Sequence, residues 1–219
     1  MTTGLPPRPG RDAGPDRAPE LAIDEATLDT DPIRQFQRWF DDAVAAGIEE
    51  PHAMTLATAA VDGTPSARMV LMKGVDNRGF TFFTNYRSDK GRELAANPRA
   101  ALVFRWLPLQ RQVRVTGTVT KVTRAESVDY FRGRPRDSQL GAWASAQSEP
   151  IADRRALLDR MDEVAARFGD GEVPLPPWWG GYRVRPLTLE LWQARLGRLH
   201  DRVRYERAGR RWRMERLQP

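Results

Sequence analysis

Short runs of apolar and β-branched residues follow one another closely along most of this chain, separated by turn-forming residues. These runs cover 53–61, 67–73, 80–84, 100–106, 112–122, 182–185, 188–193, 200–206 and 212–217. Asp62-Gly63, the segment 76–79 and Ala208-Gly209 are typical turn sequences between such runs. No repeated strand–helix–strand unit calls for a parallel sheet. The pattern therefore predicts a mainly β fold, an antiparallel barrel with peripheral helices.

Four helices are predicted at the periphery of this barrel. Asp31-Pro32 provides an N-cap and a first-turn proline for a helix that ends at Gly47. Ser88 caps a short second helix, a capping box at 123–126 begins a third that runs to 131, and an apolar stripe predicts a fourth from about 151 to 168. The Pro- and Trp-rich segment 173–181 is predicted to be a loop.

Two parts of the chain are expected to behave differently. The N-terminal segment is rich in Pro, Gly and Arg and almost lacks apolar residues, so 1–30 are predicted to form a flexible tail. Residues 31–219 are predicted to form a single domain. The N-terminus has no apolar core of signal-peptide type and no segment approaches a membrane-spanning length, so a cytoplasmic protein without a membrane partner is expected.

Composition excludes some chemistry and points to an anionic partner. The chain has no cysteine, so it has no disulfide, thiolate metal ligand or cysteine nucleophile, and its two histidines lie far apart. We therefore expect no metal site. Basic residues outnumber acidic ones by 35 to 29, and only three of the 35 are lysines. Because this chain otherwise uses arginine, Lys73 and Lys90 are candidates for a role that needs a compact ammonium group.

The segment 198–202 (RLHDR) is the first candidate site. On a strand, the alternation of side chains places Arg198, His200 and Arg202 on one face. That face is either a solvated strand surface or a wall that holds an anionic ligand.

A second candidate is 68–73 (RMVLMK), in which strict alternation places Arg68 and Lys73 on opposite faces. Both reach one pocket only if the strand contains a bulge or the ligand lies along its edge. The alternative is a core strand with charged ends. Further along the chain, 84–90 ends with Lys90 at a predicted helix N-terminus, which favours a phosphate.

A third candidate is the polar run 134–139 with Gln147-Ser148 downstream, whose side chains suit phosphate or amide groups. The sequence contains no Walker loop, dinucleotide-binding glycine fingerprint or zinc-ligand spacing.

In this order and spacing, the motifs resemble the pyridoxine/pyridoxamine 5′-phosphate oxidase family, whose members are FMN enzymes with a split-barrel fold. The resemblance runs from about residue 31 to residue 219. It is carried by RMVLMK (68–73), FFTNY (82–86), RQVRVTG (111–117), YFRGRPRDSQLGAWAS (130–145), QS (147–148), WGGYRV (179–184), LELWQ (189–193) and RLHDR (198–202).

The resemblance implies roles for individual residues. It implies FMN contacts at Arg68, Met69, Val70, Leu71, Met72, Lys73, Phe83, Thr84, Lys90, Gln112, Gln147, Ser148, Trp192 and Arg202. It implies that the substrate phosphate is held by Lys73, Tyr130, Arg134 and Ser138, and that Arg198, Leu199 and His200 line the substrate ring. Arg198 and His200 are the implied catalytic residues, and a homodimer is expected because the family builds its site between two subunits.

The implied reaction transfers a hydride from C4′ of a small phosphorylated pyridine to the flavin, which dioxygen then reoxidises. Its products are pyridoxal 5′-phosphate and H₂O₂. The sequence departs from the family pattern at several positions. Residues 10–25 lack the family's Arg-x-x-Tyr element, and Asp89, Glu50 and Leu191 replace a frequent Arg, Asp and Phe.

The missing Arg-x-x-Tyr element keeps one alternative open, and the high pI with aromatic residues near arginines keeps a second. One is a flavin oxidase of the phenazine-biosynthesis type, which shares the scaffold and oxidises a larger tricyclic substrate. The other is a basic nucleic-acid-binding barrel, although the chain has no aromatic RNA-binding strand motif and no basic helix. Two cations and two hydroxyls at Lys73, Tyr130, Arg134 and Ser138 favour a phosphorylated substrate over a phosphate-free tricycle. Because the basic charge is also spread along the chain, we expect no nucleic-acid partner.

Overall fold

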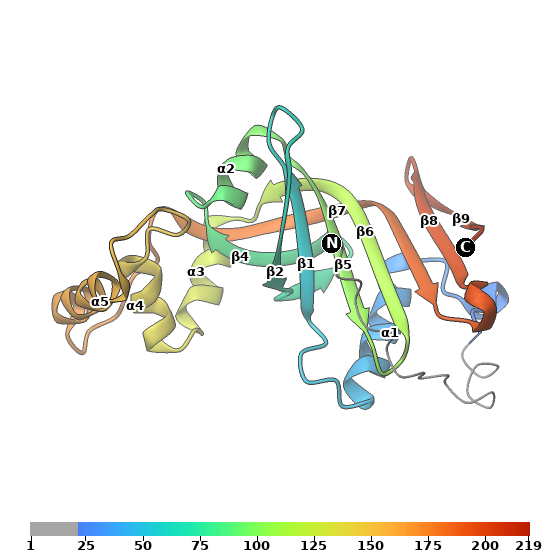
Figure 1. Cartoon of the computed structure of the whole chain (residues 1–219), viewed down its shortest axis with the longest axis horizontal. Coiled ribbons are helices and arrows are strands. Elements are labelled where there is room, and N and C mark those ends of the chain that lie inside the picture. The colour runs from blue at the N-terminus through green and yellow to red at the C-terminus, as the bar shows by residue number, and fades with distance from the viewer. Residues whose placement is uncertain (1–21) are drawn as a thin grey trace, which may run out of the picture.

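The computed structural model describes residues 22–219, and all strand pairings within them are antiparallel. The strands form one curled sheet, a half-barrel, in the order β2-β1-β5-β6-β7-β4-β3, with β8 and β9 continuing from β7 (Figure 1). The elements are η1 (Glu25–Thr27), α1 (Pro32–Ala45), β1 (Ala53–Ala59), β2 (Pro65–Leu71), β3 (Gly74–Asp76), β4 (Gly79–Asn85), α2 (Asp89–Ala96), β5 (Arg99–Trp106), β6 (Arg111–Lys121), α3 (Arg124–Arg132), α4 (Arg136–Ala144), α5 (Arg154–Phe168), β7 (Trp179–Gln193), η2 (Leu196–Arg198), β8 (Asp201–Ala208) and β9 (Arg211–Arg216). The predicted antiparallel β architecture with peripheral helices is confirmed.

Helix α1 supplies much of the main core. Its N-cap is Asp31, whose side chain accepts a hydrogen bond from the backbone N–H of Ile33, as the sequence predicts. Phe36 is fully buried, and its ring centroid lies 4.8 Å from that of Phe80 and 4.9 Å from that of Phe104. These aromatic contacts fix the helix against β4 and β5.

Strand β7 organises the sheet because it is long and has different neighbours along its two halves. One edge pairs with β6, whereas the other pairs with β4 over 179–184 and with β8 over 188–193. The register with β6 shifts between Thr116 and Gly117, opposite Pro186. A Cβ on Gly117 would lie 2.1 Å from the carbonyl oxygen of Arg185, so only glycine fits this close approach. The sequence predicted two separate strands here, but the bulge lets one strand continue through the proline.

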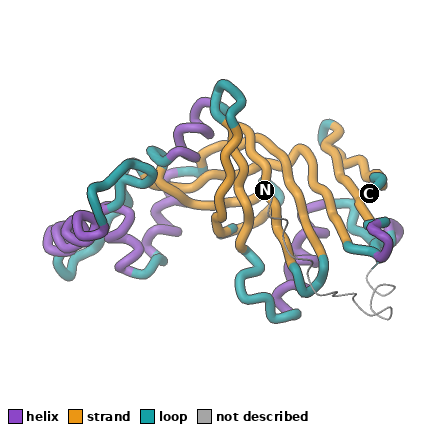
Figure 2. The backbone as a smooth tube through the Cα atoms, in the orientation of Figure 1, coloured by secondary structure: helices purple, strands orange, loops and turns teal. Residues whose placement is uncertain are grey.

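Helices α3, α4 and α5 lie together beyond one end of β7, where they form a second core (Figures 1 and 2). Its buried residues are Phe131, Leu140, Val173, Leu175 and Trp179. The predicted capping box of α3 is confirmed, with Thr123 and Glu126 each bonding to the other's backbone. Helix α4 was not predicted, and its N-cap is Pro135, which makes no side-chain capping bond. The loop at 173–181 buries its apolar residues in this core.

Tertiary contacts begin earlier than the predicted domain start at residue 31. Ile23 is buried, its N–H donates to Asp201, and its carbonyl accepts from Arg216. The carbonyl of Asp29 accepts from the hydroxyl of Tyr205. Residues 22–30 are therefore tied to the β8–β9 hairpin by hydrogen bonds that the composition of this segment does not reveal. The rest of the predicted tail, 1–21, lies outside the described residues. No helix within residues 22–219 is long and apolar enough to cross a membrane.

Candidate active site

A cavity of about 660 Å³ lies where β2 and β4 meet α2, α3 and α4. Its lining contains twelve of the residues singled out from the sequence: Arg68, Met69, Val70, Leu71, Lys73, Phe83, Thr84, Lys90, Tyr130, Arg134, Ser138 and Gln147. Gly133, Pro135 and Trp179 complete it. We call this cavity the β2–α4 pocket. It brings together residues from segments far apart in the sequence, and four of its side chains are cationic.

Arg68 and Lys73 both line this pocket because β2 ends at Leu71. Lys73 follows the strand, and its N–H donates to the carbonyl of Thr81 on β4. The alternation argument therefore stops before Lys73, and no bulge is needed. The side chain of Met72, in contrast, is buried in the main core, outside the pocket lining.

A cluster of polar side chains accepts hydrogen bonds from the guanidinium of Arg68. Its Nη2 lies 2.5 Å from the hydroxyl of Ser66 and 3.2 Å from a carboxylate oxygen of Glu93, and its Nη1 donates to Thr58. Glu93 also accepts hydrogen bonds from Thr58 and Ser66. Burial opposes ionisation of Glu93, but these hydrogen bonds and the charge of Arg68 outweigh it and lower the pKa of the carboxyl. The cluster fixes one edge of Arg68 and leaves the guanidinium at the pocket wall.

Lys90 adds a desolvated cation at the first turn of α2. Its side chain is buried, with Nζ 3.5 Å from the hydroxyl of Ser88, the helix N-cap. Burial, followed by the charge of Arg68, lowers the pKa of Lys90. Ser148 lies at the same helix end and accepts a hydrogen bond from the N–H of Asp89 at 3.2 Å. An anion bound here would be stabilised by both cations and by the helix N-terminus.

Aromatic rings form the opposite wall of the pocket. The rings of Phe83 and Tyr130 stack with centroids 3.9 Å apart and planes 9° apart, and Trp179 stacks nearly parallel to both. Arg134 lies over the Trp179 ring at 4.6 Å from its centroid. Its Nη1 is buried and has no hydrogen-bond partner among residues 22–219, and burial lowers the pKa of the Arg134 guanidinium. This buried donor needs an acceptor that the described part of the chain does not supply.

The remaining predicted site residues lie together at the other end of β7. Gln112, Trp192 and Arg202 are directly opposite one another on β6, β7 and β8, so their side chains share one face of the sheet. Arg202 makes a bidentate ion pair with the buried carboxylate of Glu190, at 3.0 and 3.1 Å. The imidazole of His200 packs on Trp192, with ring centroids 4.6 Å apart.

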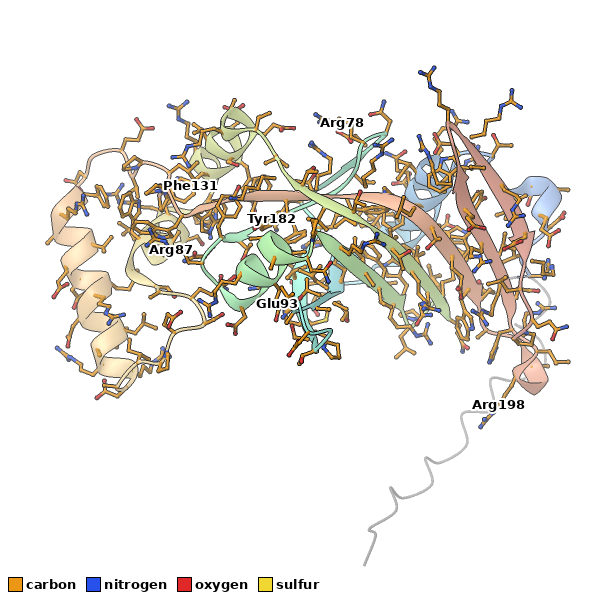
Figure 3. The ribbon with its side chains drawn as sticks, turned by 90° about the horizontal axis from the view of Figure 1, so that it is seen from above. Arg78, Arg87, Glu93, Phe131, Tyr182 and Arg198 are labelled. Atoms are coloured by element: carbon orange, nitrogen blue, oxygen red, sulfur yellow. The ribbon has the colours of Figure 1, made fainter. Side chains whose placement is uncertain are left out.

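The prediction that Arg198, His200 and Arg202 share one strand face is wrong for Arg198. Strand β8 begins at Asp201, and Arg198 ends the short 3₁₀ turn η2 with a φ of +61°. Arg198 is exposed and points away from the sheet (Figure 3), as Leu199 beside it is also exposed. His200 Nδ1 accepts a hydrogen bond from the N–H of Arg195, which leaves Nε2 free to donate.

The predicted site is thus divided between two ends of one strand. Trp179 lines the β2–α4 pocket, and Trp192 belongs to the other cluster. Twelve residues of β7 lie between them, so their Cα atoms are up to roughly 40 Å apart at about 3.3 Å per residue step. Figure 1 shows β7 crossing the molecule between α4 and β8. One chain alone does not bring the two groups together.

The model of the family described as pyridoxamine 5′-phosphate oxidase matches residues 40–168. The chain belongs to this family. A second model, described as the pyridoxine 5′-phosphate oxidase C-terminal dimerisation region, matches 179–219. Among relatives, the pyridoxine/pyridoxamine 5′-phosphate oxidase of Rubrobacter xylanophilus is 59% identical over 91% of this chain and 91% of its own. That of Salinibacter ruber is 57% identical over 91% of this chain and 94% of its own.

Two solved structures share this fold. The crystal structure of PhzG from Burkholderia lata, in complex with tetrahydrophenazine-1-carboxylic acid, superimposes with a TM-score of 0.84 at 35% identity, covering 92% of this chain and 96% of that one. A related FMN-binding protein from Nostoc punctiforme, 16% identical, shows the same fold with a TM-score of 0.70, covering 88% of this chain and all of that one.

Sequence reasoning missed Trp179 and Glu93 as parts of the site. Trp179 was expected to be buried. It is buried, and it also lines the pocket. The only signal for it was its place in the motif at 179–184. Glu93 gave no signal, because its role depends on the packing of α2 against β1 and β2.

Proposed function

We propose that this protein is an FMN-dependent oxidase that converts pyridoxamine or pyridoxine 5′-phosphate to pyridoxal 5′-phosphate, with dioxygen as acceptor and H₂O₂ as product. With the amine substrate, water is also consumed and ammonia is released. The observation that carries the proposal is that Lys73, Tyr130, Arg134 and Ser138 line one cavity. Two cations and two hydroxyls suit a phosphate monoester, which carries two negative charges and accepts several hydrogen bonds. The names and the high identity of the bacterial relatives support it.

The residues present fit an FMN phosphate in the β2–α4 pocket. Arg68 and the buried Lys90 repel each other, and an anion between them would relieve that repulsion at the N-terminus of α2. The cavity volume is within the range of small-molecule sites. When bound, FMN would supply the redox chemistry, accepting a hydride from the substrate and passing the electrons to dioxygen.

The protein's own residues would bind, orient and desolvate the reactants. Lys73 and Arg134 would hold the substrate phosphate, and the Phe83–Tyr130–Trp179 stack would exclude water beside it. Arg134 would then gain the acceptor that its buried Nη1 lacks. These contacts fix one end of the substrate, so the position of its reacting carbon depends on them.

We also propose a homodimer in which the β2–α4 pocket of one copy meets the Trp192 end of the other. The match of 179–219 to a dimerisation region supports this arrangement. Arg198 and His200 of the second copy would then approach the substrate ring, with Nε2 of His200 available as a donor. An exposed arginine with positive φ is a strained conformation of the kind found at binding sites.

A phenazine-type oxidation is the second candidate, because PhzG superimposes over nearly the whole chain. Parallel assays of the purified yellow protein with pyridoxamine phosphate, pyridoxine phosphate and a dihydrophenazine carboxylic acid separate the two. We expect equimolar peroxide and pyridoxal phosphate from the phosphorylated substrates. Turnover of the phenazine alone would replace the first proposal by the second, and a colourless protein that gains no flavin on incubation would refute both.

A further inference from the structure

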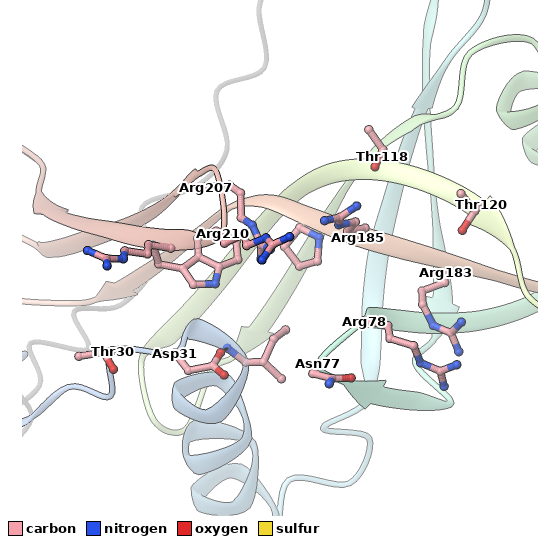
Figure 4. Close-up of a pocket in the computed structure, with 14 residues that line it drawn as sticks. Thr30, Asp31, Asn77, Arg78, Thr118, Thr120, Arg183, Arg185, Arg207 and Arg210 are labelled. Atoms are coloured by element: carbon pink, nitrogen blue, oxygen red, sulfur yellow. Dashed lines mark hydrogen bonds between the residues drawn. The ribbon is translucent and has the colours of Figure 1, made fainter.

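A second cavity, of about 870 Å³, lies apart from the β2–α4 pocket and shares no lining residue with it. We call it the arginine pocket, because six arginines line it: Arg78, Arg183, Arg185, Arg207, Arg210 and Arg211. They come from the β3–β4 turn, from β7 and from the β8–β9 hairpin, and the start of α1 closes one side (Figure 4). The pocket plays no part in the function proposed above.

The charges in this pocket are balanced on one side only. Arg78 and Arg183 share the carboxylate of Glu126, at 3.2 and 2.8 Å, and Arg78 also pairs with Asp76. The hydrogen bond from Arg183, with those from Thr123, lowers the pKa of Glu126 to about 2, so this carboxylate stays ionised even in mild acid. On the other side, neither Arg185 nor Arg210 contacts a carboxylate within residues 22–219.

Figure 4 shows Arg207 and Arg210 on the β8–β9 hairpin, Arg183 and Arg185 on β7, and Arg78 beside Arg183. Arg207 is held by its bond to the carbonyl of Gly209 and by its position over the ring of Trp212. None of the guanidinium groups of Arg185, Arg207 and Arg210 forms an ion pair within residues 22–219. Asp31 is the one acidic residue in the described lining, and its carboxylate caps α1 by accepting a hydrogen bond from the N–H of Ile33, so positive charge remains in large excess. Such an arrangement is unfavourable unless solvent ions or an anionic ligand occupy it.

The pocket floor offers further donors. Thr118 pairs with Arg185 and Thr120 with Arg183 across β6 and β7, so these four side chains project from one sheet face. Neither threonine hydroxyl bonds to another described residue. Nε of Arg183 is buried and has no partner among residues 22–219. Hydroxyl and guanidinium donors in one concavity are the groups that bind phosphate oxygens.

We propose that the arginine pocket binds an organic polyphosphate, a ligand with two or more linked phosphate groups. A single phosphate would meet only part of the unneutralised charge at Arg185, Arg207 and Arg210, and it would leave most of the 870 Å³ unused. A linked polyphosphate spans the three guanidinium groups, and its organic part has room beside Trp212 and the start of α1. This proposal does not depend on the oxidase activity.

Isothermal titration of the FMN-loaded dimer with ATP and inorganic pyrophosphate tests the proposal, with adenosine as the uncharged probe. Arg185→Ala, Arg210→Ala and the double variant remove the unpaired cations. The matched control is the double variant Arg154→Ala/Arg160→Ala, which removes two exposed arginines of α5 that have no acidic partner among residues 22–219. Arg210 is exposed in the hairpin turn, so its single variant should fold even if the double variant does not.

We expect ATP and pyrophosphate to bind the native protein, and adenosine to give no signal. Each single variant should weaken ATP binding about tenfold, because each removes a charge-assisted contact. The α5 control should keep the native affinity, and all variants should keep the native oxidase turnover. Absence of polyphosphate binding, equal loss in the α5 control, or unchanged affinity in Arg210→Ala would overturn the proposal.

Discussion

Replacing Arg134 by methionine should make the flavin-free, substrate-free protein more stable and the enzyme nearly inactive. In the native chain, a buried and unpartnered Nη1 costs about 1–3 kcal/mol, since a charged donor is taken from water without an acceptor. The cation–π contact of the guanidinium with Trp179 offsets about 0.5–1 kcal/mol of this cost. Methionine is shorter but unbranched and flexible, so its thioether can still contact the rings, and it has no donor to satisfy.

The difference between these contributions favours methionine by about 1 kcal/mol, which should raise the melting temperature by roughly 2–4 °C for a chain of this length. Activity should change in the opposite direction. A hydrogen bond to a charged group contributes about 1.5–3 kcal/mol, so two lost bonds to the substrate phosphate should lower kcat/KM at least about a hundredfold. Calorimetry of the apoprotein and steady-state kinetics of the FMN-loaded enzyme measure the two effects.

Arg132→Met is the matched control, because Arg132 is exposed on the last turn of α3 and makes only a solvent-exposed ion pair with Glu172. It should leave both melting temperature and kcat/KM close to the native values. Added phosphate should stabilise Arg134→Met less than it stabilises the native apoprotein and the control, because the variant keeps the anion site at Arg68 and Lys90 but loses one cation of the substrate-phosphate site. A lower melting temperature in Arg134→Met, with the control unchanged, would show that the guanidinium stabilises the empty pocket and would refute the reasoning.

Three further outcomes are expected. Glu93→Ala should reduce the preference for FMN over riboflavin about tenfold, because Arg68 loses its hydrogen bond to the Glu93 carboxylate. Glu93→Gln should keep most of this preference. Equal preference in the native protein and the alanine variant, measured by fluorescence titration, would contradict this expectation. Arg198→Leu should remain a yellow dimer with kcat/KM lowered on the order of a hundredfold, and native kinetics would remove Arg198 from the site. The hydrogen bond from Arg183 lowers the pKa of Glu126 from 4.5 to about 2, so ionised Glu126 stabilises the folded protein fully above pH 4.5 and loses this effect as the pH falls toward 2. Glu126→Gln should therefore flatten the acid side of the plot of unfolding free energy against pH. An unchanged plot would count against the contact.

The periodic parts of the fold could be predicted from the sequence, and the exceptions have local causes. Alternation and turn residues located most strands to within two residues, and Asp31 and Thr123 marked two helix starts. Helix α4 could not be predicted from a capping residue, because its N-cap is Pro135, which forms no side-chain capping bond. Alternation failed at Arg198 because Gly197 and Arg198 both have positive φ, which no pattern of hydrophobic residues records.

The candidate site was predictable as a set of residues but not as an arrangement. The order of the motifs predicted that Arg68, Lys90, Tyr130 and Arg134 belong to one site, and these four residues line one pocket. Their division from the Trp192 cluster depends on the length of β7, which sequence reasoning had broken into two strands. Contacts such as that between Glu93 and Arg68 depend on tertiary packing alone, so no local sequence pattern predicts them.

The length of β7 has a genetic consequence. In the proposed homodimer, where groups from opposite ends of β7 meet across two copies, two chains that are each inactive would restore activity to each other. A chain carrying Arg134→Met keeps an intact Trp192 end, and a chain carrying Arg198→Leu keeps an intact pocket. In a mixed dimer, one composite site would collect both defects and the other would have neither. Co-expression of the two defective genes would therefore yield working enzyme, a complementation that a site built within one chain would never produce.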